Sequence, residues 1–143
     1  MMDKFEDILI SMGTGKSWEK KPEGRWLEDL GLDVEKMALV MVEAGARLVP
    51  VSASSLDTGE FRLIYHWDLE GNLLNCATLT RQGALPAIVR ICPAADWIER
   101  EIHDYYAVKF SGRDLPTLVL NEQDTPGIFA HKFQRKNKPG GRA

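Results

Sequence analysis

The segment from Pro93 to Leu120, PAADWIEREIHDYYAVKFSGRDLPTLVL, decides the fold because it combines bulky apolar side chains with a dense cluster of charge. The sequence predicts a helix beginning at Pro93. Proline suits the first helical turn, because the backbone N–H groups of that turn have no acceptor within the helix. At 3.6 residues per turn, one stripe of this helix collects five residues, with Trp97 beside them. The stripe comprises Ala94, Ile98, Ile102, Tyr105 and Tyr106.

The charged residues of this helix fill the rest of its surface: Asp96, Glu99, Arg100, Glu101 and Asp104. Arg100 is four residues from both Asp96 and Asp104, so it can pair with either carboxylate. One interpretation is a solvated charged face over a core-facing stripe. The other is a surface that binds another protein through Trp97, Arg100 and Tyr105, since these residue types dominate interface hot spots. Spacing alone does not choose between them.

The motif W-x-E-R-E and the residues after it resemble the 30-kDa subunit family of respiratory complex I. That family also supplies a subunit, or a fused N-terminal domain, to energy-converting membrane-bound nickel–iron hydrogenases and formate hydrogenlyase. A weaker resemblance extends back to about Val34. Eight positions match the family pattern in register: Trp97, Glu99, Arg100, Glu101, Asp104, Tyr106, Phe110 and Gly112.

The chain departs from the family pattern at two places. Ala107 stands where the family usually has glycine, which predicts a less sharply turned helix exit. After Gly112, the usual His-Pro pair is replaced by the segment Arg113-Asp114-Leu115-Pro116. The resemblance implies that this loop contacts the large partner subunit. The chain is also shorter than most complex I versions. These departures favour a hydrogenase-type complex over complex I itself.

The resemblance implies a non-catalytic structural or assembly subunit that docks on a large nickel–iron-hydrogenase-like subunit, beside an iron–sulfur subunit. The alternatives are a subunit of NADH:quinone oxidoreductase (complex I) proper and a free-standing protein-binding module. We expect no cofactor or metal in this chain, and no catalysis by it alone. The expected partner interface comprises Trp97, Glu99, Arg100, Glu101, Asp104, Tyr105, Phe110, Gly112, Arg113 and Asp114.

Within that interface, the hypothesis is that Glu99-Arg100-Glu101 forms a partly buried ion-pair network, because buried charges persist when they are paired. Such a network contributes more to specificity and register than to affinity. Trp97 and Tyr105 would supply the apolar hot spot.

Composition limits the remaining classes of function. The 143 residues carry a net charge of −3 and 27% charged residues, which suits one domain with an ordinary surface and no nucleic-acid footprint. No apolar run approaches the ~20 residues that span a bilayer, and the acidic N-terminus does not resemble a secretory signal. We therefore expect a cytoplasmic protein, peripheral on the inner face of the cell membrane through partner subunits. Cys76 and Cys92 are predicted to be reduced core thiols.

Three segments are predicted: an N-terminal helix and connection over 1–33, the family-like domain over 34–121, and a disordered basic tail over 122–143. The first contains a short helix over 3–10 that turns Phe5, Ile8 and Leu9 inward, and a docked turn with Trp26 and Leu27. The tail is rich in basic residues that can lie against an acidic partner or anionic lipid: Lys132, Arg135, Lys136, Lys138 and Arg142.

The family-like domain is predicted to be an α+β two-layer sandwich, with an antiparallel sheet of about four to five strands and helices on one face. A helix after the N-cap Asp33 turns Val34, Met37, Ala38 and Met41 inward. Further elements follow from alternation and turn residues. They are an edge or bulged strand over 47–52 containing Pro50, a half-buried strand over 61–67, and strands over 73–81, 87–92 and 117–120.

Other motifs do not predict chemistry. Gly13-Thr14-Gly15-Lys16-Ser17 ends like a phosphate-binding loop, but Ile10 holds the place of its first glycine and a helix precedes it where a strand is needed. Glu99 and Glu101 point to different sides of a helix, and His103 can pair with Glu99. No Ser or Cys has a base partner recognisable in the sequence.

Overall fold

The computed structural model of the chain describes residues 3–116 and 126–127. The predicted strand over 117–120 and the predicted tail over 122–143 lie outside the described residues. The elements, in chain order, are α1 (Lys4–Met12), β1 (Glu19–Lys21), β2 (Gly24–Glu28), α2 (Val34–Glu43), β3 (Arg47–Ser55), β4 (Phe61–Leu69), β5 (Asn72–Leu79), β6 (Ala84–Pro86), α3 (Ala95–Tyr106) and β7 (Lys109–Ser111).

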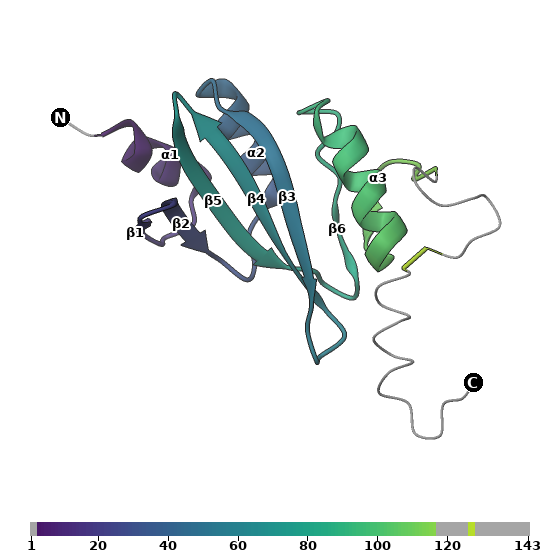
Figure 1. Ribbon diagram of the computed structural model, residues 1–143. Helices are drawn as coiled ribbons and strands as arrows, with labels where there is room; N and C mark the ends of the chain where they lie inside the picture. Colours follow the sequence, from purple (N-terminus) through teal and green to yellow (C-terminus); the bar gives the residue numbers. More distant parts are fainter. Residues whose placement is uncertain (1–2, 117–125, 128–143) are drawn as a thin grey trace.

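Five strands form the main sheet in the order β1-β2-β5-β4-β3, antiparallel except for the parallel pair β2–β5. Helices α1 and α2 lie behind this sheet, and α3 lies beyond β3 next to β6 (Figure 1). A second, two-stranded sheet pairs β6 with β7 in parallel. This arrangement confirms the predicted α+β two-layer sandwich. Within the described residues, no helix is long and apolar enough to cross a bilayer.

The first two helices begin at capping carboxylates. Asp3 accepts a hydrogen bond from the N–H of Phe5 at 2.9 Å, and Asp33 accepts one from the N–H of Lys36 at 3.0 Å. These bonds satisfy donors that the first helical turn would leave unpaired. The predicted inward residues of both helices are confirmed as buried: Phe5, Ile8, Leu9, Val34, Met37, Ala38 and Met41.

The strand predictions are confirmed where alternation was strongest. Every second residue of β4 is buried, from Phe61 to Leu69. Pro50 lies in β3, an edge strand whose register against β4 shifts between Leu48 and Val51. Proline cannot donate to a ladder, so an edge position with an irregular register suits it.

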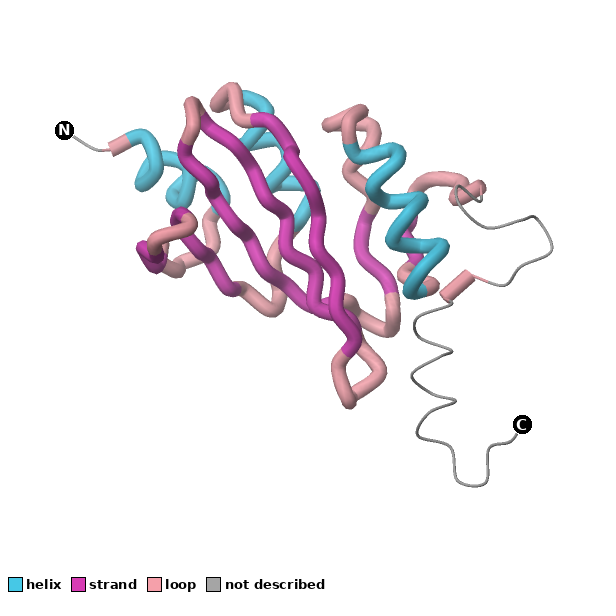
Figure 2. Tube along the Cα trace, in the orientation of Figure 1, coloured by secondary structure: helices cyan, strands magenta, loops and turns pink. Residues whose placement is uncertain are grey.

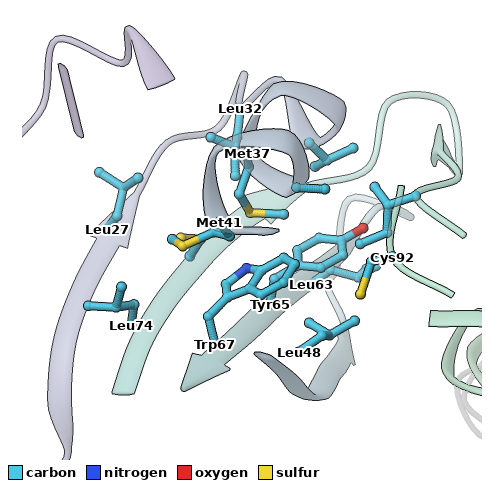
Figure 3. Packing of buried hydrophobic residues seen from close by; sticks show 14 of the residues in the cluster. Leu27, Leu32, Met37, Met41, Leu48, Leu63, Tyr65, Trp67, Leu74 and Cys92 are labelled. Atoms are coloured by element: carbon cyan, nitrogen blue, oxygen red, sulfur yellow. The ribbon is translucent and has the colours of Figure 1, made fainter. Parts of the chain in front are cut away.

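The core lies between the sheet and α2. Figure 3 shows Trp67, Tyr65 and Leu63 of β4 beside Met37 and Met41 of α2, and all five side chains are almost fully buried. The two cysteines are free and buried, as predicted: Cys76 and Cys92. Burial raises the pKa of the Cys76 thiol to about 12, so it stays a neutral thiol.

Two of the predicted elements are wrong. Trp26 and Leu27 belong to strand β2 and not to a turn. Their local sequence pattern is weak, and the parallel pairing of β2 with β5 determines their conformation. Residues 87–92 form turns rather than a strand, since the N–H groups of Ile91 and Cys92 both donate to the carbonyl of Ile88. The strand lies earlier, at β6, where its partner is β7.

Candidate functional site

Helix α3 has a buried face that differs from the predicted stripe. Ile102 is buried as expected, but Ala94 is exposed and Ile98 is half-buried. The fully buried residues of α3 are Ala95, Glu99, Ile102 and Asp104. The prediction placed both carboxylates on the outer surface because charge normally faces water. Glu99 can face inward because Ile88 and Arg113 of this chain supply polar partners for its carboxylate.

Glu99 is only 1% exposed and lies between two such partners. One carboxylate oxygen accepts a hydrogen bond from the N–H of Ile88 at 2.7 Å, and the other accepts one from Arg113 at 3.2 Å. Burial raises the pKa of Glu99, although the bonds from Ile88 and Arg113 oppose this effect. The expected pairing of Glu99 with His103 is wrong, because the Nδ1 of His103 is 2.8 Å from the carbonyl oxygen of Val108.

Arg113 connects the loop after β7 to α3. Its guanidinium donates to the carboxylate of Asp96 at 2.6 Å, to the backbone carbonyl of Asp96 at 3.3 Å and to Glu99 at 3.2 Å. The side chain is 10% exposed, so these bonds form with little competition from water. The hydrogen bond from Arg113 is the main reason that the pKa of Asp96 is lowered.

Arg100 holds the same loop from the next helical turn. Its Nε donates to the carbonyl of Pro116 at 3.3 Å, and its Nη1 is 3.5 Å from the carboxylate of Asp96. The predicted pairing of Arg100 with Asp96 is confirmed. The network that the structure shows is therefore centred on Asp96, Glu99, Arg100 and Arg113, whereas Glu101, expected in the network, is exposed.

The exit of α3 also differs from expectation. Ala107 adopts the left-handed conformation with φ of 61°, so the helix ends in a sharp turn even though the residue is not glycine. This conformation crowds a Cβ and costs about 1–2 kcal/mol. Gly127 lies beside this exit and donates its N–H to the carbonyl of Asp104 at 2.6 Å. A Cβ at Gly127 would be 2.8 Å from the Cβ of Ala107.

The predicted interface residues fall into three groups by burial. Four are exposed and able to meet a partner: Trp97, Glu101, Gly112 and Asp114. Three are half-buried: Arg100, Tyr105 and Arg113. Glu99, Asp104 and Phe110 are buried within the chain, where Phe110 pairs β7 with β6. These last three side chains are therefore not on the surface of the chain.

Trp97 is the most conspicuous member of the exposed group. Its side chain is 67% exposed, the highest value among the exposed large hydrophobic residues of the described chain. It projects from a helix whose buried residue Glu99 is held by Arg113. Exposed tryptophan is one of the residue types enriched at interface hot spots.

Only part of this site carried a signal in the sequence. Arg113 belongs to the segment that departs from the family pattern, but no local sequence pattern links it to Glu99, which lies fourteen residues earlier. Gly127 carried no signal, because a glycine about twenty residues after a helix end predicts no contact with it.

Residues 33–139 match the family model described as the 30 Kd subunit of respiratory-chain NADH dehydrogenase. The chain belongs to this family. This result confirms the resemblance that the W-x-E-R-E motif carried.

Two relatives illustrate the similarity within the 30 Kd subunit family. The C/D-type subunit of NADH-quinone oxidoreductase from Methylococcus capsulatus is 41% identical over 65 residues, which cover 42% of this chain and 11% of that protein. The C-type subunit of NADH-quinone oxidoreductase from Rickettsia conorii is 28% identical over 78 residues, covering 52% of this chain and 32% of the relative. The chain thus spans a third or less of the length of these relatives.

Solved structures show the same fold. A chain from an archaeal respiratory membrane complex, the membrane-bound sulfane sulfur reductase, superposes with a TM-score of 0.76 and 19% identity, covering 98% of this chain and 92% of that chain. The trypsin-resistant fragment of Nqo5 gives a TM-score of 0.62 at 19% identity and covers 81% of this chain and 100% of that fragment.

Proposed function

We propose that the chain is a non-catalytic structural subunit of a membrane-associated oxidoreductase complex of the energy-converting nickel–iron hydrogenase or formate hydrogenlyase type. It docks on the large subunit of that complex, beside an iron–sulfur subunit, and stays at the inner face of the cell membrane through these partners. The observation that carries this proposal is the exposure of Trp97 on helix α3, whose buried Glu99 pairs with Arg113 of the following loop.

The docking surface is the exposed part of α3 together with the loop over 112–116. Trp97 supplies apolar area, and Glu101 and Asp114 supply a polar rim. Arg100 and Arg113 keep the loop in one position before binding, so less conformational entropy is lost when the partner arrives. The carboxylates of Asp96 and Glu99 act indirectly: both pair with Arg113, and Asp96 also pairs with Arg100.

The second candidate is a subunit of NADH:quinone oxidoreductase proper. The curated relatives carry that name, which favours it. The hydrogenase-type candidate is supported by the departure from the family pattern after Gly112, where Arg113-Asp114-Leu115-Pro116 replaces the usual His-Pro pair. Nickel in the purified assembly would favour the first candidate, and a flavin-containing, NADH-oxidising assembly would favour the second.

The test is assembly in the native operon. Trp97→Ala and Arg100→Ala should each reduce the amount of large subunit that co-purifies with this chain from membranes, while the isolated variants keep their circular dichroism spectra. Leu30→Ala is the matched control, because Leu30 is also 61% exposed but lies far along the chain from α3. Full assembly and activity of both α3 variants would contradict the proposed docking surface.

A further inference from the structure

The sheet face turned away from α2 carries a second cluster of polar side chains, separate from the α3 site. Figure 2 shows this face of the sheet with no described helix over it. His66 of β4 lies on it, between Ser52 of β3 and Asn75 of β5. The sequence did not reveal this cluster, since the three residues come from different strands.

The distances order the three side chains as a chain of hydrogen bonds. Ser52 Oγ is 2.8 Å from Nε2 of His66, and Nδ1 of His66 is 2.6 Å from Oδ1 of Asn75. The amide nitrogen of Asn75 donates to the carbonyl of Arg25 at 3.2 Å. A carbonyl can only accept, so this bond fixes the amide nitrogen of Asn75 toward Arg25 and its oxygen toward the imidazole.

The fixed amide sets the tautomer of His66. Because Oδ1 of Asn75 can only accept, the ring hydrogen of neutral His66 lies on Nδ1. Nε2 then carries a lone pair and accepts the hydroxyl hydrogen of Ser52. Asn75 is 1% exposed, and the indole of Trp26 packs edge-on against the imidazole with ring centres 6.2 Å apart. These contacts hold the ring in one orientation.

Nucleophile, base and orienting group thus stand in the relation used in nucleophilic catalysis. The orienting residue is an asparagine, which serves the same role in cysteine–histidine–asparagine sites. Ser52 is exposed, so a small reagent can reach its Oγ. We propose that Ser52 is a nucleophile toward small activated esters, with His66 as its general base and Asn75 as the positioning residue.

The reaction is an acyl transfer to Ser52. Its Oγ forms a bond to the carbonyl carbon of the ester, and the Oγ proton passes to Nε2 of His66. The bond between the carbonyl carbon and the leaving oxygen then breaks, and His66 returns the proton to the departing alcohol or phenol. No oxidant, reductant or metal is needed. This site lies apart from the α3 docking surface and does not depend on the proposed function.

Ser54 is an internal control on the same strand. It is exposed two residues further along β3 on the same face, but it stands opposite Arg62 instead of beside a histidine. General-base assistance typically contributes ~10²–10⁴-fold. When the full-length chain is treated with p-nitrophenyl acetate, we expect Ser52 to be acetylated on the order of 10² times faster than Ser54. Peptide mass spectrometry locates each ester.

The variant His66→Gln removes the base, and it should reduce acetylation of Ser52 to the rate of Ser54 while circular dichroism shows an unchanged fold. Ser52→Ala should abolish the fast labelling, and Ser54→Ala should leave it intact. Equal rates at Ser52 and Ser54 in the unaltered chain would overturn the proposal, whether or not the histidine variant folds. Undiminished labelling of Ser52 in folded His66→Gln would overturn it as well.

Discussion

The sheet with α2 and the end of the molecule around α3 are stabilised in different ways. Around α2 the interior is apolar, with Met37, Met41 and Trp67 fully buried. Around α3 the interior includes the carboxylates of Glu99 and Asp104, and the loop beside the helix is held by arginine. The first region follows from hydrophobic periodicity. The second depends on pairings between groups far apart in sequence, and it is where the exposed Trp97 lies.

Two tryptophans provide the strongest test of this contrast. Trp67 is fully buried and Trp97 is 67% exposed. Trp67→Ala should lower the free energy of unfolding by about 4 kcal/mol, because it leaves a large cavity. Trp97→Ala should change it by less than about 0.5 kcal/mol. Urea denaturation of both variants measures these effects. Similar losses in both variants would contradict the division into a core tryptophan and a surface tryptophan.

Glu99 tests whether buried charge pairing stabilises the α3 end. Glu99→Ala leaves the N–H of Ile88 and part of Arg113 without an acceptor, and we expect a loss of about 3 kcal/mol in unfolding free energy. Glu99→Gln keeps one acceptor oxygen, so its loss should be about 1 kcal/mol. Denaturation curves of the two variants compare these values. An alanine variant as stable as the unaltered chain would show that the pairing contributes nothing.

Ala107 offers a change of the opposite sign at the end of α3. Its φ of 61° suits glycine better than alanine. Ala107→Gly should therefore raise the free energy of unfolding by up to about 1 kcal/mol, after the greater entropy of unfolded glycine is subtracted. A higher melting temperature would confirm that the left-handed exit stores strain. Destabilisation would mean that the methyl group contributes more by packing than it costs by crowding.

The pH dependence of Glu99 gives the smallest and most specific effect. Its pKa in the folded chain is raised above the ordinary value of 4.5. Stability from this group is therefore fully present below that value and is lost as pH rises through the folded pKa. The unfolding free energy of the unaltered chain, minus that of Glu99→Gln, should decrease as pH rises from about 4 to 7. An increase over this range would mean that Arg113 outweighs desolvation and lowers the pKa.

The elements around α2 could be predicted from sequence because their signals are local. Asp33 marks the start of α2, Pro50 marks an irregular edge strand, and alternation defines β4. Strand β2 escaped prediction because its pairing partner β5 lies about fifty residues later. The position of β6 was misplaced for a similar reason, since β7 determines it.

At the α3 site, the sequence predicted the helix and its pairing of Arg100 with Asp96. It did not predict which face is buried, because the partner that allows Glu99 to be buried is Arg113, in a loop after the next strand. Likewise, Ser52, His66 and Asn75 become neighbours through strand register, which no short motif records.

The docking role of the α3 surface is tested most directly by a photo-crosslinking residue placed at position 97, with position 30 as the control, in cells that assemble the native complex. We predict that irradiation links position 97 to the large subunit and leaves position 30 unlinked to it. Crosslinks to the large subunit from position 30 but none from position 97 would contradict the assignment of this surface.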